Sequence, residues 1–193
     1  MPRTNIPLAN ATQAGIVLAR KGTTLPHEAD YALLPICYYI VFHSIGSRIF
    51  DLREKQGLFY SATGMLAVDA TRDNTGLDFV CTAVDPTNIE TTILQLQELL
   101  QKQHSNPQVT REELRAAQRW YERLTVERLR HAESVCETFM LYKRLYPERE
   151  YYDVVREHLV RVQKATVADV NELFTRVFKA PFVHVIVSGC CQK

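Results

Sequence analysis

Runs of β-prone residues stand near the start, in the middle and at the end of the chain, and the stretches between them carry apolar residues at helical spacing. The three clearest runs are Ala14–Arg20, Leu77–Val84 and Phe182–Ser188. Strands this far apart must share one sheet, so the intervening helices have to cover it. We therefore expect an α+β fold, with an antiparallel or mixed β-sheet and helices packed mainly on one face. The length of 193 residues predicts a single domain over 1–193.

The expected helices differ in how their apolar residues are distributed. Residues 29–43 are apolar nearly all round, which indicates a buried helix, and we expect Pro35 to kink or restart it. A second helix follows Asp85-Pro86 and presents one apolar face, formed by Ile89, Ile93, Leu96 and Leu100. Capping boxes at Thr110 and Thr166 begin two further helices, and one or two more fill 133–146 and 150–163.

A short helix and a hairpin lie between the first helix and residue 84. Ser47 is a good N-cap and Gly57 a good C-cap, so the helix between them should be short. Residues 60–70 then predict a strand and 71–76 a turn. Together with Leu77–Val84 they form an expected antiparallel hairpin.

Charge and hydropathy exclude several classes of function. There are 23 basic and 22 acidic side chains, a net charge of +1, which argues against a nucleic-acid-binding domain. No stretch reaches the roughly 18 apolar residues of a membrane span, and the first residues are followed by no apolar segment of a signal peptide. We expect a soluble protein, and the sequence does not indicate its compartment.

Familiar catalytic motifs are absent. The six histidines never form H-x-x-E-H or another zinc-ligand spacing, so no metal site is expected in this chain. There is no phosphate-binding glycine loop and no G-x-S-x-G elbow. Cys37, Cys81 and Cys136 lie in apolar runs and are expected to be buried. The adjacent Cys190 and Cys191 leave open a thiol or redox function.

Two hydrogen-bond donors stand on either side of the expected helix-to-strand corner. Arg53 and Tyr60 are seven residues apart, and a guanidinium and a phenol placed there could both donate to the carbonyl oxygens of one peptide. On spacing alone, a surface arginine and a half-buried strand tyrosine are the favoured interpretation.

The segment that contains this pair resembles a motif of a known family. The matching residues are Ser47, Arg48, Ile49, Phe50, Leu52, Arg53, Glu54, Lys55, Gly57, Leu58 and Tyr60. They are similar to the C-terminal, non-catalytic domain of pitrilysin/insulinase-type zinc metallopeptidases, which include the mitochondrial processing peptidase. The order of the later elements is also similar, and the resemblance covers about residues 13–190.

The resemblance implies a function for one half of a two-part enzyme. In that family one half binds zinc through H-x-x-E-H, and the other half engages an extended peptide opposite the metal, with an Arg and a Tyr that correspond by motif position to Arg53 and Tyr60. The chain has His27-Glu28 without the second histidine. The resemblance therefore implies that this chain has no catalytic residue, holds no cofactor and is inactive alone. It also implies that a partner domain or subunit binds the zinc and that the substrate is a peptide.

A second interpretation belongs to a different class of protein. A degenerate family member can act as a structural scaffold or assembly subunit, as the core subunits of the respiratory cytochrome complex do. In that case Arg53 and Tyr60 would serve folding only. The presence of H-x-x-E-H elsewhere in the full-length gene or in its neighbours separates the two interpretations.

Overall fold

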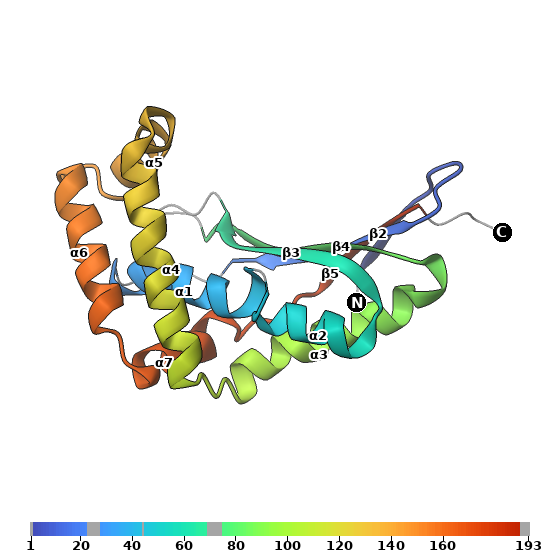
Figure 1. Cartoon of the computed structure of the whole chain (residues 1–193). Coiled ribbons are helices and arrows are strands. Elements are labelled where there is room, and N and C mark those ends of the chain that lie inside the picture. The colour runs from blue at the N-terminus through green and yellow to red at the C-terminus, as the bar shows by residue number, and fades with distance from the viewer. Residues whose placement is uncertain (1, 23–27, 44, 69–74, 190–193) are drawn as a thin grey trace.

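Five strands form one sheet in the computed structural model, which describes residues 2–22, 28–43, 45–68 and 75–189. The strands are β1 Arg3–Ile6, β2 Ala14–Lys21, β3 Phe59–Val68, β4 Leu77–Val84 and β5 His184–Ser188. The helices are α1 Glu28–Phe42, α2 Arg48–Gln56, the short 3₁₀ turn η1 Pro86–Asn88, α3 Ile89–Ser105, α4 Arg111–Arg130, α5 Ala132–Leu145, α6 Tyr151–Lys164 and α7 Val167–Val177. Helices and a sheet in one structure confirm the α+β prediction (Figure 1).

The sheet is mixed. Its strand order is β1-β5-β2-β4-β3, with β1 parallel to β5 and all other neighbours antiparallel. The predicted hairpin is confirmed in β3 and β4, and its turn lies outside the described residues. Strand β1 is absent from the sequence-based prediction. Its four residues are all exposed, so no alternation of apolar and polar side chains announces it.

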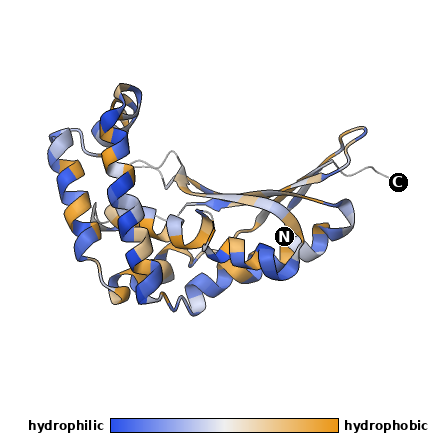
Figure 2. Cartoon of the chain, in the orientation of Figure 1, coloured by the Kyte–Doolittle hydropathy of each residue, from blue (hydrophilic) through white to orange (hydrophobic). Residues whose placement is uncertain are grey.

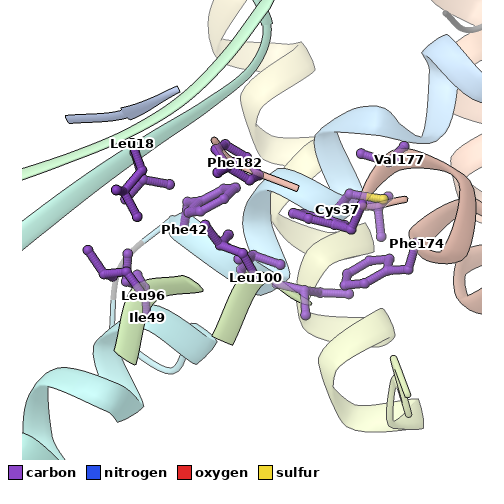
Figure 3. Packing of buried hydrophobic residues seen from close by; sticks show 14 of the residues in the cluster. Leu18, Cys37, Phe42, Ile49, Leu96, Leu100, Phe174, Val177 and Phe182 are labelled. Atoms are coloured by element: carbon purple, nitrogen blue, oxygen red, sulfur yellow. The ribbon is translucent and has the colours of Figure 1, made fainter. Parts of the chain in front are cut away.

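The core lies between one face of the sheet and the helices (Figure 1). Alternate residues of β2, among them Ile16 and Leu18, point to this face and are fully buried. Leu18 meets Phe42 of α1 and Leu96 of α3 in the centre of the core (Figure 3). The helices carry alternating hydrophilic and hydrophobic bands, as expected when one side of each is buried (Figure 2). The described helices thus lie mainly on one face of the sheet, as predicted.

Helix α1 runs without interruption through Pro35, so the expectation of a restarted helix is wrong. Its residues pack against α4, α6, α7 and β3. Burial on several sides stabilises α1 enough to offset the hydrogen bond that a proline cannot donate. The remaining helix predictions hold: the apolar face of α3 is buried, and both capping boxes are formed, at Thr110 with Glu113 and at Thr166 with Asp169.

A buried ion pair ties the sheet to the C-terminal helix. The side chains of Arg20 on β2 and Asp78 on β4 are only 2% and 3% exposed, and the distance from Arg20 Nη2 to Asp78 Oδ2 is 2.7 Å. The same guanidinium donates to the carbonyl oxygens of Val177 and Ala180 and lies 4.3 Å from the Phe182 ring centroid. These contacts fix the end of α7 and the approach to β5.

Helices α5 and α6 extend away from the sheet on α4 (Figure 1). They enclose a second, smaller core formed by Leu145, Tyr146 and Val154. Cys136 lies on the outer side of α5 and is exposed, so its predicted burial is wrong, whereas Cys37 in α1 is buried. Helix α5 contacts only α4 and α6 closely, which leaves this side in solvent. None of the helices in the described ranges combines the length and apolar composition needed to cross a bilayer.

Candidate functional site

The corner between α2 and β3 is built by two caps. The Ser47 side chain accepts a hydrogen bond from the Phe50 N–H, which begins α2. Gly57 ends the helix in the left-handed conformation, with a φ of 63°, and its N–H donates to the Arg53 carbonyl. A residue with a Cβ is strained at this φ, so glycine permits the abrupt change from helix to strand. Both caps were predicted from the sequence.

This corner places Arg53 and Tyr60 side by side. The Arg53 guanidinium carbon lies 5.3 Å from the centroid of the Tyr60 ring and 5.1 Å from that of Phe50. Arg53 Nη1 donates to Glu54 Oε1 at 2.8 Å. Tyr60 is 84% exposed, and its hydroxyl has no hydrogen-bond partner among the described residues. The two donors therefore face solvent together, on the surface next to the sheet edge formed by β3.

An apolar hollow of about 300 Å³ adjoins this pair. Its lining residues come from the end of α1, the loop between α1 and α2, α2 itself and the first residues of β3. Besides Arg53 and Tyr60 they are Phe42, His43, Ile45, Ser47, Ile49, Phe50, Phe59, Ser61 and Ala62. No pattern in the sequence predicted the hollow. Ile45, in the loop before α2, is 80% exposed, a property that becomes visible only in the structure.

A polar network holds α2 against the rest of the molecule. Arg48 donates from Nε to Glu113 Oε1 at 2.9 Å, and also to the Gln103 side chain, so it joins α2 to α3 and α4. Burial acts to raise the pKa of the Glu113 carboxyl, but the hydrogen bonds from Arg48 and Thr110 outweigh it and the pKa is lowered. The carboxylate form that Arg48 needs is thus favoured.

Four rings gather beside the hollow, at the contact of α1 with α4. Trp120 lies 4.8 Å from His43 and 5.1 Å from Tyr39, measured between ring centroids, and Tyr38 completes the group at 6.0 Å from Trp120. All four side chains are partly exposed. Burial lowers the pKa of the His43 imidazole, which favours its neutral form. This aromatic cluster is a second feature that no pattern in the sequence predicted.

Metal-ligating side chains do not gather in the part of the chain that is described: no group of three His, Cys, Asp or Glu residues has the proximity that a metal ion needs. His27, which in the sequence lacks the second histidine of a zinc-binding motif, lies outside the described residues. So do Cys190 and Cys191, which carried the thiol interpretation.

Comparison with known proteins finds the same fold in solved structures. No protein-family profile matches the chain, and no curated protein matches it. A peptidase M16 inactive domain from Pseudomonas fluorescens superposes with a TM-score of 0.78 over 99% of this chain, at 18% identity. An inactive peptidase domain from Bordetella parapertussis gives a TM-score of 0.70 over 87% of this chain, at 15% identity, and covers 87% of that domain. A chain of complex III₂ from Candida albicans gives 0.70 over 97%, at 14% identity.

The chain has the fold of a half-domain of M16 peptidases. The resemblance that its sequence shows to the non-catalytic domain of zinc metallopeptidases is thereby confirmed at the level of the fold. The chain spans less than half the length of several of these solved chains, 44% of the Pseudomonas chain and 45% of the Candida chain. Within this fold, Arg53 and Tyr60 lie together at the corner between α2 and β3 and line the same hollow.

Proposed function

We propose that this chain is the non-catalytic, substrate-binding half of a bipartite zinc metallopeptidase, and that it holds an extended peptide opposite a zinc site carried by another domain or subunit. The observation that carries the proposal is the contact between Arg53 and Tyr60, two solvent-facing donors beside an apolar hollow. The inactive M16 domains among the similar structures support the same function.

The two donors suit the backbone of a peptide. Arg53 uses Nη1 on Glu54, and its other N–H groups have no partner among the described residues. They and the Tyr60 hydroxyl are available to donate to carbonyl oxygens of an extended chain. Fixing the peptide in this way lowers the entropic cost of reaching the reactive geometry, and a donor near the scissile carbonyl also stabilises the developing oxyanion. Zinc in the partner half would supply the activated water.

The hollow next to the donors determines which peptide side chains the chain prefers. Phe42, Ile49 and Phe59 line it, and its volume of about 300 Å³ is sufficient for one apolar side chain of the peptide. Transfer of such a side chain out of water favours binding by about 1.5–3 kcal/mol. We therefore expect peptides with an apolar residue next to the bound carbonyls to be preferred.

The test uses the chain reconstituted with its zinc-binding half. Tyr60→Phe and Arg53→Ala should each reduce peptide turnover by about 10- to 100-fold, because each removes a donor aimed at the substrate, and zinc content should stay unchanged. Arg156→Ala is the matched control, because Arg156 is an exposed arginine on α6, far from the corner in sequence, and forms an ion pair with Asp153 of its own helix. Wild-type turnover in both site variants would contradict the assigned role.

A scaffold function is the second candidate, and the chain of complex III₂ among the similar structures favours it. Under this alternative the pair would serve folding. An exposed cation–π contact contributes only about 0.5–1 kcal/mol to stability, however, which is a weak reason to keep an 84% exposed tyrosine there. If neither the full-length gene nor its neighbours encode H-x-x-E-H, the scaffold is the better explanation.

A further inference from the structure

Helix α4 presents a row of arginines beside the aromatic cluster. Arg115, Arg119 and Arg123 follow one another at intervals of four residues, so they lie along one side of the helix. All three are exposed, and none has a hydrogen bond or ion pair with the described residues. Elsewhere on the surface, Arg130 and Arg156 each hold a carboxylate of their own helix. The three guanidinium groups thus have no carboxylate partner among the described residues, and Glu122 shares one hollow with Arg115 and Arg119.

Trp120 joins this row to the aromatic cluster. It precedes Arg123 by three residues, which places the two side chains next to each other on α4. The indole N–H has no partner among the described residues and is not buried, so it too is a free donor. His43 lies against Trp120 and also lines the hollow beside Tyr60. His43 and Trp120 thus connect the hollow beside Tyr60 to Arg123, the end of the row that lies nearest to the rings.

We infer that this surface, formed by Trp120, Arg115, Arg119 and Arg123, binds an acidic segment of the extended peptide, a step that rests on the proposed function. Helix α4 carries six arginines and four glutamates, so its net charge favours an anionic ligand. Successive arginines of the row are about 6 Å apart along the helix axis. Alternate side chains of an extended peptide are about 6.7 Å apart. A segment with acidic residues at every second position, following an apolar or aromatic residue, therefore fits the row and the rings.

Three exposed cations on a chain of net charge +1 match a short acidic peptide better than a nucleic acid. A nucleic-acid site draws most of its affinity from many phosphate contacts and from a strongly basic surface. Here the row extends over only about 12 Å, the length of three to four peptide residues. A single-stranded oligonucleotide is nevertheless a useful competitor, because it would reveal the other class of ligand.

The experiment follows the fluorescence of Trp120, the single tryptophan of the chain. Two tryptophan-free peptides share a phenylalanine-containing extended segment and end in Glu-Ser-Glu-Ser-Glu or Gln-Ser-Gln-Ser-Gln. The acidic peptide should bind about tenfold more tightly, since three exposed charge pairs contribute a fraction of a kcal/mol each. The advantage should shrink as salt rises from about 50 to 300 mM, because counterions screen exposed charges.

Variants assign the effect to the row. The double variant Arg119→Gln/Arg123→Gln should lose the preference for the acidic peptide and keep its affinity for the neutral one. The matched control, Arg130→Gln/Arg156→Gln, removes two exposed arginines that already have partners and should keep the preference. Equal affinities of the wild type for the two peptides, an unchanged preference in the Arg119/Arg123 variant, or tighter binding of an oligothymidylate would each overturn the inference.

The same titrations separate this inference from the proposed function. Arg53→Ala should weaken both peptides by the same factor, which leaves the ratio between them unchanged. Failure of Arg53→Ala to weaken either peptide would contradict the proposed role of Arg53 and leave the acidic preference standing. If the two peptides bind equally well and Arg53→Ala still weakens both, only the inference about the arginine row is contradicted.

Discussion

The imidazole of His158 is enclosed by aromatic rings between α5 and α6. It is 5% exposed, and its ring centroid lies 5.3 Å from that of Tyr142 and 5.8 Å from that of Tyr146. Its Nε2 is buried without a partner among the described residues. Burial, assisted by the nearby Arg149 cation, lowers the pKa of His158 from 6.5 to about 4. The folded protein thus holds this ring neutral where the unfolded chain would protonate it.

His158 makes stability depend on pH in a defined window. The unfolded chain binds more protons than the folded one between about pH 4 and 6.5, so the free energy of unfolding falls as the pH is lowered through this range. Above pH 6.5 the imidazole is neutral in both states and His158 costs no stability. The difference between the pKa values of the unfolded and folded states corresponds to a loss of about 3 kcal/mol in the free energy of unfolding, which is complete below pH 4. Urea titrations at pH 7, 6, 5 and 4 should show this loss in the wild type.

His158→Phe should flatten that dependence, because a phenyl ring keeps the aromatic contacts and cannot be protonated. The control is His131→Gln, since His131 has a 70% exposed side chain and its replacement leaves the burial of His158 untouched. An equally steep loss of stability in His158→Phe and in the wild type would show that other groups cause it.

Whether a site residue could be predicted from the sequence depends on how close in sequence its contact partners are. Arg53 and Tyr60 were predictable, because seven residues, an N-cap and a glycine C-cap determine their meeting within one corner. The aromatic cluster was not, because His43 and Trp120 are far apart in sequence. Their contact depends on how α1 packs against α4, which no local pattern specifies.

Helix α2 has too little buried surface to hold its position by apolar packing alone. Ile49 is its single buried residue among nine, and five of the others are charged. The hydrogen bonds from Arg48 to Glu113 and Gln103 therefore act as its main anchor to α3 and α4. Since the same helix carries Arg53, the anchor also fixes one half of the proposed site.

Arg48→Met should loosen α2 and destabilise the protein by about 1.5–3 kcal/mol, the usual contribution of hydrogen bonds to charged groups. Hydrogen exchange measured by mass spectrometry should become faster in residues 48–56 and remain unchanged in α6. Arg161→Met is the control, because Arg161 lies on α6 and its ion pair, at 3.4 Å, is with Asp169 of α7. Unchanged exchange in α2 of Arg48→Met would mean that packing alone holds the helix.

At the level of elements, the sequence predicted what side-chain periodicity encodes. Leu77–Val84 was predicted with its correct bounds, since every second residue is buried. Strand β1 was missed because its backbone, rather than its side chains, secures it: the Val185 N–H donates to the Pro2 carbonyl, and the Gly189 N–H to that of Ile6. Such hydrogen bonds depend on the presence of β5 and leave no trace in composition.

One face of the whole sheet carries apolar side chains with no described helix over it. Val17 on β2 is in register with Cys81 on β4 and with Ile186 on β5, and all three are partly exposed on this face. Met65 and Leu77 are 40% and 44% exposed near the hairpin end. Because the described helices cover the other face (Figure 1), this one forms a contiguous apolar surface over several strands.

A contiguous apolar surface should bind an environment-sensitive hydrophobic dye even when the chain is fully folded. Met65→Lys/Leu77→Lys should lower the dye signal about twofold or more, because two ammonium groups interrupt the surface without burying a charge. Leu94→Lys/Val126→Lys, on the outer sides of α3 and α4, adds the same charge at residues that are 58% and 50% exposed. This control should keep the wild-type signal, since isolated apolar residues bind dye weakly. An equal loss in both variants would mean that net charge, rather than the sheet face, determines dye binding.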